Sequence, residues 1–330
     1  MELWKLRLSM VATLALIFGL STLVFAGILF YFQALDFVTI GILVVSFNIV
    51  QWLFAPYLVG AIYKVREMKQ DENPKLHQMV TDLSRKSGIS VPKLMLAQIP
   101  LPNAFAYGSP VSGSRVAVTQ GLLSNLNDGE VEAVLGHELG HLKHRDVQVM
   151  MVVSFLPALC YYIGYSLMLS GMFGGQQNKN NNGNGAIIGI AFMAFSWILT
   201  LFTLQVSRLR EYYADRHSVS VVDDGANKLS TGLAKIVHAS ARTAKPQQQQ
   251  QQTKNFSGFK SLFIANPETA SDDSAMLNAF ENNQKLVDDF LAKRITFGDK
   301  LIEALSTHPN IVKRLRALQE LSKNPPAYAV

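Results

Sequence analysis

The stretch VEAVLGHELGH at residues 131–141 decides the fold, because it places a His-Glu-x-x-His motif inside a helical apolar pattern. On a helix, His137 and His141 lie one turn apart and share a face. Two neutral imidazoles in that arrangement can bind one zinc ion, and Glu138 beside them can take a proton from a water molecule. The motif therefore predicts a zinc centre, against the simpler interpretation of an amphipathic helix with stray histidines.

A catalytic zinc needs a third protein ligand and an open fourth position. His144 is one candidate, but on an unbroken helix it lies about 10 Å along the axis from His137. Metal–nitrogen bonds are only about 2 Å long, so we interpret His144 as an interfacial residue or a support for a ligand. Glu211 is the other candidate, and Asp215, one helical turn later, is placed to accept a hydrogen bond from a ligand histidine. Taken alone, this acidic pair is more typical of a solvated helix face.

The two motifs together, HELGH at 137–141 and EYYAD at 211–215, resemble the HtpX-type membrane zinc metalloproteases, which are relatives of the CAAX prenyl proteases. The resemblance covers nearly the whole chain, including PNAFA at 102–106 and THP at 307–309. It implies one Zn²⁺ ion per chain, bound by His137, His141 and Glu211. It also implies that Glu138 is the general base and that the catalytic domain is zincin-like (gluzincin).

The same resemblance implies further contacts around the site. An edge strand that holds Asn103 and Ala104 is expected to line the substrate cleft, although a plain hairpin edge explains these residues equally well. His308, with Arg314 six residues later, keeps the spacing of a pair found in the active sites of the wider family. Both are candidates for substrate or oxyanion contacts, and a structural helix cap is the alternative.

The apolar residues are concentrated in four runs, at 8–35, 37–63, 147–173 and 186–206, within a chain of 330 residues that is 49% hydrophobic. A bilayer-spanning helix needs about 20 residues, so the runs predict two transmembrane hairpins rather than long soluble core helices. The first run is also too long for the core of a signal peptide. Basic residues flank the outer ends of both hairpins, which places both termini and the catalytic domain in the cytosol.

The net charge of +6 is explained by these basic flanks, and no aromatic-interleaved basic patch indicates nucleic-acid binding. Cys160 is the single cysteine of the chain, so an intramolecular disulfide is excluded. Between the hairpins, the sequence predicts a helix at 75–87, strands at 93–98, 104–107 and 115–119, and a capping box at Asn127 and Glu130. Residues 216–330 are expected to be helical, with an amphipathic stretch at 280–305, a basic helix at 311–321 and a disordered glutamine run at 247–252.

The sequence therefore predicts a multi-span α-helical membrane protein with a cytosolic α+β zincin-like metalloprotease domain. Residues 1–66 would form the first hairpin, 67–146 a subdomain with the zinc helix, 147–210 the second hairpin, and 211–330 a helical subdomain that completes the site. The resemblance implies an endopeptidase of the cell membrane that acts on polypeptides, among them damaged or misfolded membrane proteins.

Two alternatives remain open. A CAAX-type prenyl-protein protease has similar zinc motifs, but four apolar runs are fewer than that branch has. A zinc-stabilised membrane scaffold without activity would have no need of Glu138. The sequence does not indicate an oligomeric state.

Overall fold

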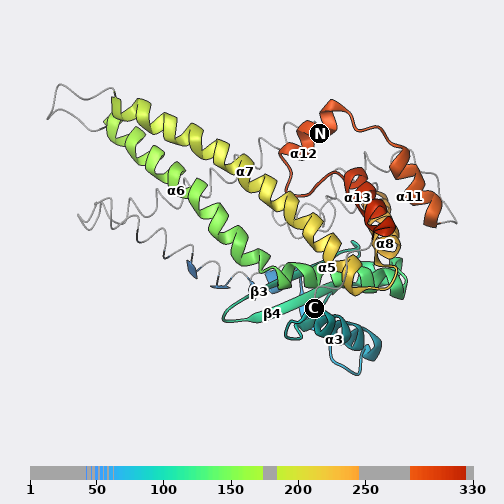
Figure 1. Cartoon of the computed structure of the whole chain (residues 1–330). Helices are drawn as coiled ribbons and strands as arrows, with labels where there is room; N and C mark the ends of the chain where they lie inside the picture. Colours follow the sequence, from blue (N-terminus) through green and yellow to red (C-terminus); the bar gives the residue numbers. More distant parts are fainter. Residues whose placement is uncertain are drawn as a thin grey trace. The chain divides into compact units, whose positions relative to one another are not determined.

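The structure is a computed structural model that describes residues 63–173, 184–244 and 283–324, together with scattered residues between 42 and 61 (Figure 1). The first apolar run, most of the second and the glutamine-rich segment lie outside the described residues. The chain divides into two compact units, residues 1–57 and 58–330, and the second contains every element described below. In chain order these elements are β1 (Val65–Glu67), α3 (Pro74–Ser87), β2 (Lys93–Ala97), β3 (Ala104–Ser109), β4 (Gly113–Thr119), α4 (Gln120–Asn125), α5 (Asp128–Lys143), α6 (Asp146–Phe173), α7 (Asn184–Val221), α8 (Gly225–Ala244), α11 (Asn283–Ala292), α12 (Phe297–Ala304) and α13 (Ile311–Lys323).

A four-stranded sheet in the order β1-β2-β4-β3 forms the β part of the described fold, with β3 at one edge. The β2–β4 pair is parallel, and the other two pairs are antiparallel. Side chains alternate between the two faces along each strand, as strand geometry requires. In β4, for example, Val116 and Val118 enter the main core with α3, α5, α8, α11 and α13, whereas Ala117 joins a smaller cluster with Tyr63 and Phe105.

The predictions that rest on local patterns are confirmed. Helix α3 ends at Gly88, whose left-handed backbone (φ 68°) forms the C-cap. Helix α5 begins with the expected capping box, in which the Asn127 side chain accepts from the Glu130 N–H and the Glu130 carboxylate accepts from the Asn127 N–H. The three predicted strands are present as β2, β3 and β4.

Two features of the fold were not predicted. Strand β1 has only three residues and follows directly on the second apolar run, so its sequence shows no alternating pattern. The strand forms because these residues pair with β2, which lies about 30 positions later in the chain. The amphipathic stretch at 280–305 is divided into α11 and α12. A second capping box, formed by Thr296 and Asp299, starts α12 and accounts for the division.

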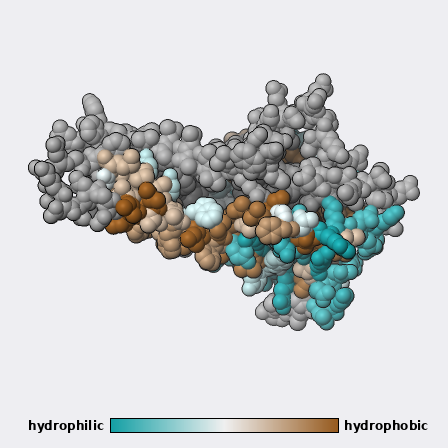
Figure 2. Space-filling model, turned by 90° about the horizontal axis from the view of Figure 1, so that it is seen from above, coloured by the Kyte–Doolittle hydropathy of each residue, from teal (hydrophilic) through white to brown (hydrophobic). Residues whose placement is uncertain are grey.

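Helices α6 and α7 lie side by side as a hairpin, and hydrophobic side chains follow it on the face shown in Figure 2. Glycines allow the two helices to approach each other closely, because a Cβ at Gly164 would lie 2.6 Å from the carbonyl oxygen of Gly189. Contacts through small residues are common between membrane helices. Within the described part of the chain, Gly185–Val221 is the one helix long and apolar enough to cross a membrane, and α6 contributes the shorter apolar stretch Leu156–Leu169. The multi-span arrangement therefore stays a prediction.

Helix α7 does not end where its apolar run ends. It continues without a break from Asn184 to Val221, so the same helix carries the run at 186–206 and the EYYAD motif. At 1.5 Å per residue its length is about 57 Å.

Candidate active site

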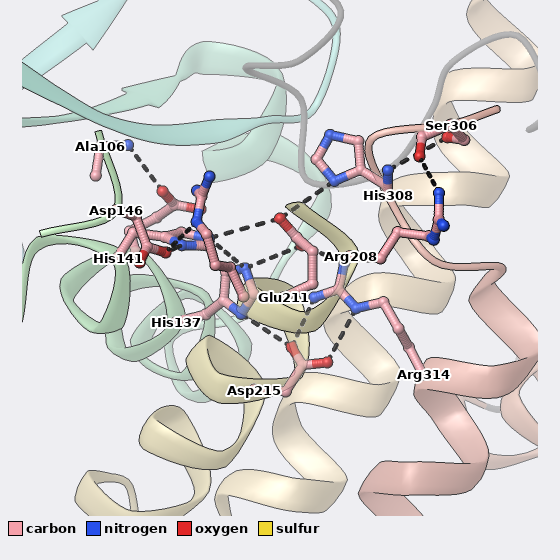
Figure 3. A network of polar contacts seen from close by, with 12 residues as sticks. Ala106, His137, His141, Asp146, Arg208, Glu211, Asp215, Ser306, His308 and Arg314 are labelled. Carbon is pink, nitrogen blue, oxygen red and sulfur yellow. Dashed lines mark hydrogen bonds and ion pairs between the residues drawn. The ribbon is translucent and has the colours of Figure 1, made fainter. Parts of the chain in front are cut away.

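Three predicted metal ligands converge from α5 and α7 (Figure 3). The Nε2 atoms of His137 and His141 lie 3.2 Å apart. Glu211 Oε2 is 3.6 Å from His137 Nε2, and Glu211 Oε1 is 3.8 Å from His141 Nε2. Donors bound tetrahedrally to one zinc ion at about 2.0–2.1 Å would lie roughly 3.4 Å from one another. The donor set and its spacing therefore fit a single zinc ion.

A second carboxylate, that of Glu138, also lies near the two histidines. Donor atoms of His137, Glu138 and His141 all lie within 4.8 Å of one another. Glu138 Oε2 accepts a 2.7 Å hydrogen bond from the backbone N–H of Ala106 in the edge strand β3. Glu138 thus faces the edge of the sheet, whereas Glu211 approaches the histidines from α7.

Each histidine turns its Nδ1 atom toward an aspartate. His137 Nδ1 lies 2.9 Å from Asp215 Oδ1, within hydrogen-bonding distance although not aligned for an ideal bond. His141 Nδ1 lies 2.5 Å from Asp146 Oδ2. Asp215 was expected at this place, whereas Asp146 was missed. The signal that could have found it is its place in the sequence, where a single acid stands between the basic run at 143–145 and the apolar run at 147–173.

The charge balance of His141 follows from these contacts. Burial alone would lower the pKa of the His141 imidazole, but the hydrogen bond with Asp146 and the charges of Glu211 and Glu138 raise it. Burial alone would raise the pKa of Asp146, but His141 and Arg210 lower it. Asp146 is therefore favoured in its ionised form, and the His141 imidazole is favoured with a proton on Nδ1, the nitrogen that faces Asp146.

Arg314 and His308 both reach the site from the C-terminal segment (Figure 3). The Arg314 side chain is buried; Nε and Nη2 donate to Asp215 at 3.0 and 2.6 Å, and Nη1 lies 3.1 Å from Glu211 Oε2. Burial alone would lower the pKa of Arg314, but the two carboxylates raise it. His308 Nδ1 lies 3.3 Å from Glu211 Oε1. Arg314 therefore binds the two acids of the EYYAD motif, and His308 lies beside the first of them.

Arg208 holds the segment that carries His308. Its Nη1 atom donates to the carbonyl oxygens of Glu303, Ala304 and Ser306 at 2.8, 3.0 and 2.8 Å, which satisfies the C-terminal end of α12. Sequence reasoning treated Arg208 only as a basic flank of the membrane hairpin. Its Nη2 atom also donates to the nearby Gln205 Oε1, but no local pattern identifies its role, because the partners of Nη1 are backbone groups about a hundred positions away.

The residues expected at the substrate edge are in β3 or directly before it. Ala104 pairs with Val118, and the Asn103 backbone exchanges hydrogen bonds with Thr119. Both residues are fully buried. The backbone contact with Glu138 is made not by these two residues but by Ala106, two positions after Ala104.

His144 lies outside the group formed by His137, Glu138 and His141. It is the C-cap of α5, and its exposed ring lies 6.0 Å from the Tyr213 ring and 6.2 Å from the His217 ring, between centroids. This placement agrees with the interfacial interpretation.

Two glycines allow α5 to approach α7 closely enough for the site to form. A Cβ at Gly140 would lie 3.1 Å from the Ala214 Cα atom and 3.1 Å from the His217 Cβ atom. A Cβ at Gly136 would lie 3.1 Å from the Val222 side chain and 3.2 Å from Ser218 Oγ. These glycines directly precede His137 and His141. The part of α5 that lies closest to α7 is therefore the part that carries the two histidines.

Gly140→Ala is expected to weaken zinc binding by about tenfold, because the new methyl group pushes the α7 backbone, and with it Glu211, away from the histidines. Helix propensity alone predicts the opposite, since alanine favours a helix over glycine by about 1 kcal/mol. Zinc affinity is measured by competition with a chromophoric chelator. Gly129→Ala in the same helix is the control, because the tightest contact of its methyl group is with the flexible Lys228 side chain, and Asn127 Oδ1 lies at an ordinary 3.6 Å. Equal affinity in the two variants would contradict the packing argument.

Comparisons with known protein sequences agree with this geometry. The model of a family described as "Peptidase family M48" matches residues 70–322. A "Protease HtpX homolog" of Thermoplasma acidophilum is 35% identical over 325 residues, which cover 96% of this chain and 97% of that protein. A "Protease HtpX homolog" of Aeropyrum pernix is 37% identical over 287 residues, 86% of each chain.

A solved structure, the crystal structure of S. mikatae Ste24p, resembles the fold with a TM-score of 0.53 at 18% sequence identity. The likeness covers 96% of this chain and 66% of that one. At this identity the likeness concerns the fold alone.

Proposed function

Because the chain belongs to peptidase family M48, and is a metalloprotease, we propose that it is a membrane-embedded zinc endopeptidase that cleaves peptide bonds at the cytosolic face. The observation that carries the proposal is the meeting of His137, His141 and Glu211 at distances that fit one zinc ion. Glu138 lies beside them, between the metal ligands and the edge of β3.

In this proposal, His137, His141 and Glu211 hold zinc, which when bound polarises the scissile carbonyl and makes a water more acidic. Glu138 takes the proton of the attacking water and passes it to the leaving amine. The hydrogen bond from Ala106 keeps the Glu138 carboxylate turned toward the sheet edge. Asp215 and Asp146 hold the two imidazoles in the tautomer whose Nε2 atoms are free to bind metal.

His308 and Arg314 have different roles in this proposal. Arg314 is committed to Glu211 and Asp215, so it fixes the two carboxylates rather than contacting substrate. His308 contacts only Glu211 among these groups, and its second ring nitrogen has no hydrogen-bond partner within the described residues. It is therefore the better candidate to donate a hydrogen bond to the developing oxyanion.

The substrate would bind as an extended segment along β3, which is one of the two edge strands of the described sheet and the one that contacts Glu138. The Asn103–Ala104 stretch begins this edge, and Glu138 lies beside Ala106 two residues later. The substrates would be polypeptides, in particular damaged or misfolded membrane proteins, and the role would be membrane quality control. A CAAX-type prenyl-protein protease is the competing substrate class.

Removal of the metal tests the activity. Dialysis of the detergent-purified protein against 1,10-phenanthroline is expected to abolish casein cleavage, and added Zn²⁺ is expected to restore it. Cleavage is followed by gel and zinc content by mass spectrometry. Casein hydrolysis that persists in the metal-free protein would overturn the proposal. Much faster cleavage of a prenylated CAAX peptide than of casein would favour the competing class.

The proposed topology has four spans, with both termini and the catalytic domain in the cytosol. Large apolar side chains exposed along α7 support the span there, with Ile187, Trp197 and Phe202 exposed to 67, 58 and 64%. In a Cys160→Ala background, a membrane-impermeant maleimide on intact cells is expected to label Asn182→Cys, between α6 and α7, but not Ser124→Cys on the exposed surface of α4. Labelling of both, or of position 124 alone, would contradict this orientation, and lysed cells provide the control for reactivity.

A further inference from the structure

The two histidines of the site are supported by two similar chains of contacts. Behind His137 lies Asp215, and behind Asp215 lies Arg314. Behind His141 lies Asp146, and behind Asp146 lies Arg210, whose Nε atom is 3.0 Å from Asp146 Oδ2. Each Nδ1 atom therefore faces a buried carboxylate, and each carboxylate is paired with an arginine.

The first chain follows from the EYYAD motif, but the second depends on how the backbone turns after α5. On a continuous helix, a residue five positions after His141 would be rotated by about 140° and could not return to its ring. Helix α5 ends at Lys143, and Arg145 takes a left-handed conformation (φ 53°) that residues other than glycine rarely adopt. This turn starts α6 at Asp146 and brings the carboxylate back to His141.

The position of Asp146 suits a permanent negative charge. It is the first residue of α6, where the partial positive charge of a helix N-terminus favours an anion. The side chain is only 5% exposed, and the same oxygen, Oδ2, lies at hydrogen-bonding distance from His141 Nδ1 and forms an ion pair with Arg210 whose Nε atom is not aligned for an ideal hydrogen bond. If Asp146 served only to link α6 to α7, its contact with Arg210 would be sufficient. Its additional contact with His141 indicates a role at the metal site.

We propose that Asp146 is a positioning residue for His141, and that Arg210 holds Asp146 in place. This rests on the proposed metal site, in which His141 is a ligand. Asp146 fixes the ring orientation and tautomer of His141, as carboxylates behind ligand histidines commonly do. Because Asp146 begins α6 and Arg210 lies in α7, the support of His141 comes from the two ends of the apolar hairpin.

The test measures zinc affinity of the full-length protein in detergent, by competition with a chromophoric chelator. Asp146→Ala is expected to bind zinc about 10–100-fold more weakly than the parent, and Asp146→Asn, which keeps an acceptor oxygen, is expected to lose less. Arg210→Gln is expected to weaken binding by less than Asp146→Ala. Asp128→Asn, a matched change in the first turn of α5 at an exposed acid paired with Lys75, is expected to leave affinity unchanged.

Visible spectra of the cobalt(II)-substituted proteins separate positioning from general structural damage, because they report the coordination geometry of the ion. The spectrum of Asp146→Ala is expected to differ from that of the parent, and the spectrum of Asp128→Asn is not. Near-ultraviolet circular dichroism of the metal-free proteins checks that each variant folds. If Asp146→Ala misfolds, Asp146→Asn supplies the measurement.

Parent-like zinc affinity and an unchanged cobalt spectrum in a folded Asp146 variant would overturn the proposal for Asp146. Parent-like affinity in Arg210→Gln would overturn the part assigned to Arg210. His141→Ala distinguishes these failures from failure of the metal site itself: if it binds zinc as tightly as the parent, His141 is not a ligand and the proposed function fails at that point.

Discussion

Replacing Glu138 with glutamine is expected to reduce peptide hydrolysis by at least about 10²–10⁴-fold while the protein keeps about one zinc per chain. The amide has nearly the shape of the carboxylate, and its oxygen can still accept the hydrogen bond from Ala106. It cannot take a proton from the attacking water, so the chemical step fails although the metal ligands are intact. The measurement pairs the rate of casein cleavage with zinc content by mass spectrometry.

Glu132→Gln is the matched control, because Glu132 lies in the same helix but pairs with Lys228 at 3.2 Å, away from the histidines. This variant is expected to cleave casein at the parent rate. Rapid hydrolysis by a Glu138→Gln protein free of contaminating protease would exclude Glu138 as the general base. Loss of zinc from the same variant would instead indicate that Glu138 is the carboxylate that binds the metal.

Replacing Glu211 is expected to remove both tight zinc binding and activity, since only two histidine ligands remain. Glu211→Ala alone is ambiguous, because it also leaves part of the buried Arg314 cation unpaired, and breaking such a pair commonly costs about 3–5 kcal/mol. Glu211→Gln keeps the size of the side chain, so the two variants together separate ligand loss from misfolding. A zinc titration of each variant, with metal content measured at every point, gives the affinities.

The zinc affinities of two further variants are compared with those of the Glu211 variants. Asp215→Asn keeps an acceptor oxygen but removes the negative charge that faces both His137 and the buried Arg314, so about 10–100-fold weaker binding and some remaining turnover are expected. His144→Ala is expected to bind zinc like the parent, because its ring lies against Tyr213 and His217 rather than with the other histidines. Tight binding by both Glu211 variants, together with loss of zinc in His144→Ala, would show that the third ligand is misassigned.

Local patterns were sufficient for the parts of the site that lie within one helix. The capping box, the His-Glu-x-x-His spacing and the Glu211–Asp215 turn are all set by neighbours within about one helical turn. Such patterns require no knowledge of where the rest of the chain lies. The contacts that place His137 beside Asp215 and both histidines beside Glu211 join α5 to α7, and only the resemblance, not a local pattern, had implied them.

What could not be predicted depends on non-local contacts or on an unusual backbone conformation. The contact between Asp146 and His141 needs the left-handed turn at Arg145, a conformation that the sequence does not signal because the residue is not glycine. Arg208 binds carbonyl groups at the end of α12, and backbone acceptors carry no sequence signature. For Arg314, spacing indicated the site, but only the fold shows that its guanidinium faces Asp215 and Glu211.

Because α7 is unbroken, the direction in which its apolar side chains point fixes the direction in which Glu211 points. One residue inserted just after Val206 would turn Glu211 by about 100° around the helix axis and move it by about 1.5 Å along it. An insertion of nearly one full turn would restore the angle, but it would displace Glu211 by about 5.4 Å from the histidines of α5. Helix geometry therefore makes the number of residues between the apolar run and Glu211 a requirement of the proposed site, in addition to the identity of Glu211.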